Sequence, residues 1–188
     1  MISTADFKRG LTIELDGEVF QIVEFQHVKP GKGGAFVRTK LRNLRTERVF
    51  DRTFRAGERM EMAHIERRPM QYLYRGGSDY VLMDLETYDQ ITLAAQQIGD
   101  GVKYLREGLE VSVVIHEERI ISVELPDTVE LQVTDTDPGL RGDTASGGSK
   151  PAVLETGVVV EVPLFIDIGD VVRVDTRSGQ YVARVASA

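Results

Sequence analysis

The chain contains no cysteine and no tryptophan, and only 7% of its 188 residues are aromatic. Without cysteine there is no disulfide, no thiolate metal site and no cysteine nucleophile, which fits a reducing compartment. No apolar run approaches the ~18 residues that a membrane-spanning helix needs. The first ten residues carry Asp6 and Lys8 where a signal peptide has an apolar core, so we expect a cytoplasmic protein without membrane association.

Residue patterns typical of catalysis and metal binding are also missing. His27, His64 and His116 stand far apart, so metal ligation would require the fold to bring them together. Ser146 and Ser149 lack the G-x-S-x-G context of a nucleophilic serine. No pair of carboxylates indicates general acid–base chemistry. We therefore expect no catalytic residue, no metal and no cofactor, and a protein that is not an enzyme.

The net charge of −7, taken alone, argues against a nucleic-acid partner. The charge is unevenly distributed, however. Residues 1–64 hold 12 basic and 9 acidic residues, residues 65–127 hold 6 and 12, and residues 128–188 hold 5 and 9. Within the first segment, residues 26–45 carry six bases and no acid. A basic block on an acidic chain predicts a local anion-binding surface, with a solvated strand face as the plain alternative.

Short runs of Val, Ile, Phe and Tyr alternate with polar residues and are separated by Gly, Asp and Pro, which is typical of small β-barrels or sandwiches. We expect three modules, at residues 1–64, 65–127 and 128–188. Pieces of about 60 residues bury only ~60% of their unfolded surface, so the modules should pack on neighbours or be unusually well-formed barrels. The clearest expected strands are 19–28, 35–44, 111–115, 120–125, 129–133, 158–162 and 171–174.

Helical signals are few. Ser3 and Asp6 have the spacing of a capping box, which predicts a single helical turn between residues 3 and 9. Residues 87–98 contain no Gly or Pro and include two consecutive alanines, which predicts a short helix ending at Gly99.

The most unusual stretch is a glycine-rich loop between two strand-like runs, which predicts the tip of a β-hairpin. Its glycines allow the backbone to approach another surface closely, and Lys32 offers one long, flexible cation suited to reaching phosphates. If about five residues of each strand project from the barrel, the arm reaches roughly 17 Å at ~3.4 Å per residue. The residues of the loop are Lys29, Pro30, Gly31, Lys32, Gly33 and Gly34.

The strand after this loop has two chemically different faces. Period-2 geometry places Arg38, Lys40 and Arg42 on one face and apolar residues on the other. Three interpretations remain open: a phosphate-binding P-loop, an inert flexible turn, and a probing RNA-binding arm. The first is disfavoured because Gly33, rather than Ser or Thr, follows Lys32 and a strand follows the loop. The cationic face favours the third.

A second glycine-rich segment, residues 137–151, is too long for a plain connection, and either function or disorder would explain it. With this segment and the first loop, a series of motifs becomes recognisable along the chain. The motifs are K-P-G-K-G-G-A-F (29–36), M-Q-Y-L-Y (70–74), M-D-L-E-T-Y (83–88), G-D-T-A-S-G-G-S-K-P (142–151), L-E-T-G-V-V-V-E-V-P-L (154–164) and V-D-T-R-S-G-Q-Y-V (174–182). In this order and spacing, the sequence resembles the bacterial elongation factor P family over essentially its whole length.

The resemblance implies an all-β protein of three small barrels, an SH3-like (KOW-type) barrel followed by two OB-folds, in an L-shaped, tRNA-like arrangement. It also implies a monomeric translation factor that binds both ribosomal subunits between the P and E sites. Such a factor stabilises P-site peptidyl-tRNA and stimulates peptide-bond formation at consecutive prolines. It would not itself perform covalent catalysis.

The same resemblance implies roles for particular residues. The loop with Lys32 at its tip would face the CCA end of peptidyl-tRNA, and the basic strand would contact RNA. Lys32 would be the target of a modifying enzyme, through β-lysylation or a 5-aminopentanol-type extension, unless it acts unmodified. Gly142, Asp143 and Thr144 would lie near the E-site codon on the small subunit, and Tyr181 and Arg184 are further candidate contacts.

Two other functions stay open. One is an elongation factor P-like paralogue that acts on a different range of stalling sequences, which the typical K-P-G-K-G tip disfavours. The other is a general single-strand RNA-binding OB protein, which the scarcity of aromatic stacking platforms disfavours.

Overall fold

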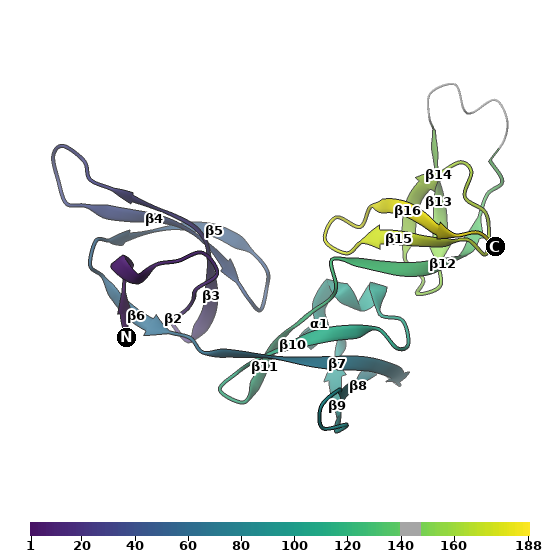
Figure 1. Cartoon of the computed structure of the whole chain (residues 1–188), viewed down its shortest axis with the longest axis horizontal. Coiled ribbons are helices and arrows are strands. Elements are labelled where there is room, and N and C mark those ends of the chain that lie inside the picture. The colour runs from purple at the N-terminus through teal and green to yellow at the C-terminus, as the bar shows by residue number, and fades with distance from the viewer. Residues whose placement is uncertain (140–147) are drawn as a thin grey trace. The chain divides into compact units, whose positions relative to one another are not determined.

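The computed structural model describes residues 1–139 and 148–188, and strands dominate it (Figure 1). The strands form three separate sheets, one of six strands and two of five. The helical segments are short: η1 (Thr4–Asp6), α1 (Ala95–Ile98) and η2 (Gly99–Tyr104). The prediction of an all-β protein is confirmed.

The first sheet has the strand order β1-β6-β2-β3-β4-β5. Asp16 and Gly17, with φ of 52° and 79°, form the two-residue turn between β2 and β3, and this turn geometry matches the twist of paired strands. The strands are β1 (Ile2–Ser3), β2 (Thr12–Leu15), β3 (Glu18–Val28), β4 (Phe36–Asn43), β5 (Val49–Arg55) and β6 (Arg59–Met62).

A helical turn closes one end of this sheet, as the capping-box spacing predicts. The Ser3 hydroxyl accepts a hydrogen bond from the Ala5 amide at 3.3 Å, and the Asp6 carboxylate accepts one from the Ser3 amide at 2.9 Å. These two bonds satisfy backbone donors that have no partner within the turn. The turn is followed by Phe7, which is buried with its ring edge-on to Phe54.

The core of the first sheet comes from alternate residues of its long strands. In β4, Val37 and Leu41 are fully buried, and Ile22 of β3 and Ile13 of β2 join them in one apolar cluster. Removing this apolar surface from water drives the folding of the sheet. The intervening residues of β4 therefore face solvent, which leaves one face of the strand available for polar contacts.

The second sheet has the order β11-β10-β7-β8-β9 and corrects one prediction. Residues 87–98 do not form a helix, because Gln90–Ala94 is strand β9 and only Ala95–Ile98 is helical. Ile91 and Thr92 are β-branched and pair with Leu82 and Val81 of β8, so sheet pairing overrides the local helical composition. The other strands are β7 (Ile65–Gly76), β8 (Asp79–Asp84), β10 (Glu110–His116) and β11 (Arg119–Glu124).

The third sheet has the order β14-β13-β12-β15-β16. Leu131, Val172 and Val174 are completely or almost completely buried between its strands, together with Ile166 from the connection before β15. Its strands are β12 (Thr128–Thr136), β13 (Ser149–Leu154), β14 (Val159–Pro163), β15 (Val171–Asp175) and β16 (Tyr181–Ala186).

By packing, the chain divides into two compact units. One contains residues 1–67 and 114–122, and the other contains residues 68–113 and 123–188. Each of the three sheets lies within one of the three expected segments. The module boundaries and the L-shaped arrangement stay predictions.

Among the described residues, no helix is long and apolar enough to cross a membrane.

Candidate nucleic-acid interface

A long hairpin formed by β3 and β4 carries the glycine-rich loop. The two strands pair from Phe20 opposite Asn43 to Val28 opposite Phe36, with one irregularity between Ile22 and Glu24. Beyond the last pair the chain forms an open loop, and its residues 29–34 are all exposed. Figure 1 shows this tip extending past the strands of the first sheet.

The tip is narrow because three of its residues are glycines, which carry no side chain. No other part of the protein packs around these glycines. Around Gly31, Gly33 and Gly34, no atom lies within 4 Å of the position that a Cβ would take. Gly33 has a φ of 101°, which favours glycine, whereas the other two have no such backbone requirement. Packing within the protein therefore does not explain the absence of side chains at Gly31 and Gly34. A thin loop can enter a crevice that side chains would block.

Lys32 is exposed at this tip, and no described residue forms a hydrogen bond or ion pair with its ammonium group. An incoming phosphate or carbonyl oxygen would therefore compete with no described residue for this ammonium group. The tip thus combines an exposed point charge with a backbone that carries no side chains at its glycines.

The cationic face of β4 has the geometry that period 2 predicts, because Arg38 and Lys40 are exposed between buried residues. Its charge is less uniform than the sequence suggests. Lys40 lies directly opposite Asp51 of β5 and Glu24 of β3, with its Nζ 4.0 Å from the Glu24 carboxylate. Two cross-strand acids therefore offset the charge of Lys40.

Arg38 has neutral neighbours instead. Gln26 lies opposite it on β3 and Thr53 lies opposite it on β5, and its guanidinium is 5.4 Å from the centre of the Phe36 ring. The Phe36 ring packs against the flat face of the guanidinium. The edge of the guanidinium stays available for bidentate contact with phosphate. Arg38 is consequently the strongest anion-binding candidate on β4.

Sequence reasoning missed one cation on this face. Arg55 at the end of β5 pairs with Phe36, which places it on the same face as Arg38 and near the loop. Period 2 along residues 49–55 could have indicated its face, but only the strand register places it beside the tip. Arg42, at the other end of the face, donates a hydrogen bond to the side-chain oxygen of Gln21.

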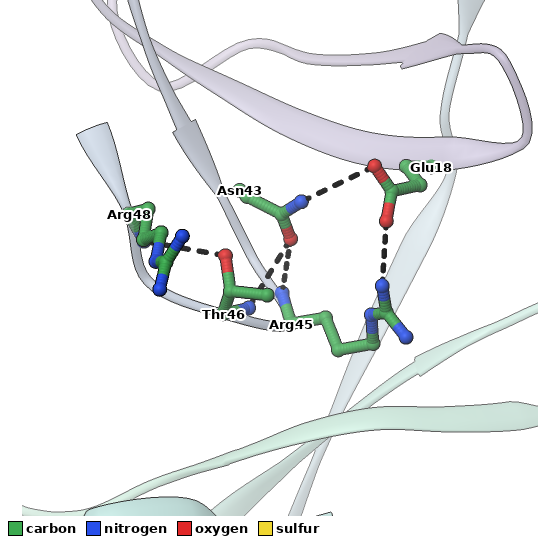
Figure 2. A network of polar contacts seen from close by, with 5 residues as sticks. All are labelled: Glu18, Asn43, Arg45, Thr46 and Arg48. Carbon is green, nitrogen blue, oxygen red and sulfur yellow. Dashed lines mark hydrogen bonds and ion pairs between the residues drawn. The ribbon is translucent and has the colours of Figure 1, made fainter. Parts of the chain in front are cut away.

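Arg45, another of the six bases, has a structural role (Figure 2). Its Nη2 lies 2.6 Å from Oε1 of Glu18, whose other carboxylate oxygen is 3.5 Å from the amide nitrogen of Asn43. The Asn43 side-chain oxygen accepts hydrogen bonds from the backbone amides of Arg45 and Thr46, at 2.9 and 3.2 Å. The turn between β4 and β5 is thereby fixed, and with it the register that aligns Arg38 and Arg55.

The C-terminal candidates belong to the second compact unit. The Arg184 guanidinium lies over the Phe165 ring at 5.1 Å, and its Nη1 is 3.7 Å from the carboxylate of buried Asp170. Backbone hydrogen bonds, first from Asp167 and also from Ala188, together with Arg184, hold the pKa of Asp170 below its usual range, against the opposing effect of burial. Arg184 thus already has internal partners.

The remaining predicted positions are less informative. Tyr181 begins β16, is partly exposed and pairs with Val174. Gly142, Asp143 and Thr144 lie outside the described residues.

Among the described residues, one group has the composition of a metal site. Glu14, His116 and Glu117 each place a potential ligand atom within 4.8 Å of the others. Sequence reasoning could not find this group, because His116 follows Glu14 by more than a hundred residues and only the fold brings the two together.

Three family models match the chain in succession: the elongation factor P KOW-like domain over residues 3–60, the elongation factor P OB domain over residues 65–123, and the elongation factor P C-terminal domain over residues 129–184. The chain belongs to the elongation factor P family. Family membership makes it a translation elongation factor and accounts for the KOW-like and OB architecture of its sheets.

Individual relatives agree with this assignment. Elongation factor P of Pelotomaculum thermopropionicum is 62% identical over 185 residues, which cover 98% of this chain and 100% of the relative. Elongation factor P of Microcystis aeruginosa is 55% identical over 184 residues, with the same coverage. Among solved structures, a translation initiation factor 5A from Methanococcus jannaschii aligns with a TM-score of 0.51 and 26% identity, covering 66% of this chain and 90% of that one.

Proposed function

We propose that this elongation factor P family member binds the ribosome between the P and E sites and contacts both subunits. There it stabilises P-site peptidyl-tRNA, stimulates peptide-bond formation and relieves stalling at consecutive prolines. The observation that carries the proposal is the exposed tip of the β3–β4 hairpin, with Lys32 on a glycine backbone that nothing within the protein surrounds. The factor works in the cytoplasm as a monomer and performs no covalent chemistry itself.

The physical basis is positioning. Proline is a constrained and poor participant in peptide-bond formation, so much of the barrier is the loss of freedom of the reacting groups. A factor that holds peptidyl-tRNA in a reactive geometry lowers this entropic part of the barrier. Lys32 contributes at the CCA end through fixed contacts with RNA oxygens. Arg38 anchors the arm on the backbone, whereas Lys40 and Arg42 contribute less because neighbouring side chains already engage them.

Lys32 is also the proposed site of modification. Its exposed amine can be reached by a modifying enzyme, and either a β-lysyl or a 5-aminopentanol extension would lengthen a side chain that already projects from the tip. Intact mass spectrometry of the protein from its native host measures this directly. A mass excess that maps to Lys32 supports the modification, and a mass equal to that of the bare sequence removes it from the proposal.

Reconstituted translation of a Pro-Pro-Pro reporter tests the function. Wild-type protein should accelerate full-length synthesis, Lys32→Ala should abolish most of this effect, and Lys8→Ala, at another exposed lysine of the same unit, should not. Unchanged rescue by Lys32→Ala would remove the role assigned to Lys32. Rescue of other stalling sequences but not of Pro-Pro-Pro would favour the paralogue. Equal affinity for free RNA and for ribosomes would favour a general RNA-binding protein.

A further inference from the structure

We propose that Glu14, His116 and Glu117 form a binding site for a single Zn²⁺ ion, separate from the hairpin arm. All three residues belong to the first compact unit: Glu14 lies on β2, His116 ends β10, and Glu117 begins the turn into β11. One imidazole and two carboxylates, with water completing the coordination, form a donor set that suits Zn²⁺.

The histidine is oriented as a metal ligand would be. Its Nδ1 is 3.1 Å from the backbone carbonyl oxygen of His64, so Nδ1 carries the proton and donates it. This bond fixes the plane of the ring and leaves Nε2 as the nitrogen that a metal ion can reach. Metal-binding histidines generally have such a partner on the second nitrogen, because it fixes the tautomer and raises the basicity of the ligand.

The two carboxylates face that nitrogen. Nε2 of His116 lies 3.8 Å from a carboxylate oxygen of Glu14 and 3.9 Å from one of Glu117. Ligand atoms about 2.0–2.1 Å from a tetrahedral Zn²⁺ are about 3.3 Å apart. The distances from Nε2 therefore need to shorten by about half an ångström, and the two carboxylates, whose ligand atoms lie within 4.8 Å of each other, need to approach by up to about 1.5 Å. The exposed side chain of Glu117 and the partly exposed one of Glu14 allow these movements.

The residues around this group carry an excess of negative charge that a cation would offset. Glu61 of β6 pairs directly with Glu14, so that a further carboxylate lies on the same face of the sheet. Directly opposed like charges are destabilising, and among the described residues no arginine or lysine forms an ion pair with Glu14, Glu61 or Glu117. A divalent cation at Nε2 would offset this repulsion and would connect β2 to the β10–β11 turn.

The choice of metal follows from the donors. Imidazole nitrogen favours zinc and its transition-metal neighbours, whereas Mg²⁺ prefers oxygen ligands and retains its water. We therefore expect one Zn²⁺ per chain and no competition from a tenfold excess of Mg²⁺.

Isothermal titration of the full chain with Zn²⁺ at pH 7.5 tests the site. Glu117→Gln should weaken Zn²⁺ binding at least about 10-fold, and His116→Gln should do the same. His27→Gln removes a histidine elsewhere in the same unit and should leave the affinity unchanged. Glu117 is the safer variant, because 76% of its side chain is exposed and its loss should not disturb folding, which circular dichroism would verify.

Imidazole ¹⁵N spectra provide a second measurement. Zn²⁺ should shift Nε2 of His116 while its Nδ1 keeps its proton, and the melting temperature of the wild-type protein should rise with Zn²⁺ concentration. The proposal is overturned if the full chain shows no saturable binding, because His116 would then serve only as an ion-pair partner for the two carboxylates. It is equally overturned if His116→Gln and Glu117→Gln bind Zn²⁺ as tightly as His27→Gln does. None of these outcomes depends on translation activity.

Discussion

The ammonium group of Lys40 lies 4.0 Å from the carboxylate of Glu24 on the neighbouring strand, whereas Arg38, two residues earlier on the same face, has neutral cross-strand neighbours. Two cations that look equivalent in the sequence therefore differ in the charge that they can offer to a phosphate. This difference can be measured on the proposed ribosomal partner.

Arg38→Gln should weaken binding to ribosomes more than Lys40→Gln does. Loss of a charged hydrogen bond to phosphate costs about 1.5 kcal/mol, roughly tenfold in affinity, and should also flatten the dependence of affinity on salt. Lys40→Gln should have a smaller effect, because the Glu24 carboxylate 4.0 Å from the Lys40 ammonium group already competes with phosphate for it. Binding measured at several salt concentrations compares the two, and equal losses would contradict the unequal roles.

Arg55→Gln should resemble Arg38→Gln rather than Lys40→Gln. Arg55 pairs with Phe36 on the same face and lies close to the tip, so it should contact the same stretch of RNA backbone. Arg48→Gln, an exposed arginine at the opposite end of the β4–β5 hairpin, provides a matched loss of charge. Equal ribosome affinities of Arg55→Gln and Arg48→Gln would show that the nearness of an arginine to the loop does not affect its contribution to ribosome binding.

Asn43→Ala should destabilise the protein by about 1–2 kcal/mol. The Asn43 side-chain oxygen accepts two backbone hydrogen bonds that hold the β4–β5 turn, and the residue is largely buried. Arg45→Gln breaks the nearby ion pair between Arg45 and Glu18. Both side chains of this pair are well exposed, so its loss should lower the free energy of unfolding by less than about 1 kcal/mol. Urea unfolding of the two variants tests this order, and a larger loss for Arg45→Gln would reverse it.

Gly33→Ala should impair rescue of the Pro-Pro-Pro reporter more than Gly31→Ala does. Both variants add one methyl group to open space, but only Gly33 has a φ that strains an alanine, by about 1–3 kcal/mol. The loop would relax and displace Lys32. Because the tip lies outside the apolar cores, both melting temperatures should stay close to that of the wild type. Equal activity losses would instead indicate that bulk alone is excluded.

Several of these features could be predicted from local sequence, and others could not. The capping box of Ser3 and Asp6 and the alternation along β4 depend on neighbours in the chain, so residue spacing was sufficient. The expected helix over residues 87–98 was wrong because Ile91 and Thr92 pair with strand β8. The local composition of residues 87–98 gives no information about that pairing. For the same reason, the charge balance at Lys40 and the meeting of Glu14 with His116 depend on strand register and on long-range packing. The motif series, in contrast, indicates the family without information about any contact.

Asp170→Asn should lower stability at neutral pH, and the difference from wild type should disappear in acid. The backbone amides of Asp167 and Ala188 stabilise the carboxylate and keep the pKa of Asp170 below its ordinary value of 3.8 in the folded protein. A group with a depressed folded-state pKa contributes its full stabilisation above the unfolded-state pKa, and this contribution is lost as the pH falls through the folded-state value. Loss of these charged hydrogen bonds should cost about 1–2 kcal/mol at pH 7.

Denaturant unfolding from pH 7 to pH 2 measures the convergence, with Asp135→Asn, at an exposed carboxylate of β12 in the same unit, as the control. A stability gap for Asp170→Asn that stays constant down to pH 2 would show that the carboxylate stabilises the protein through shape rather than through charge.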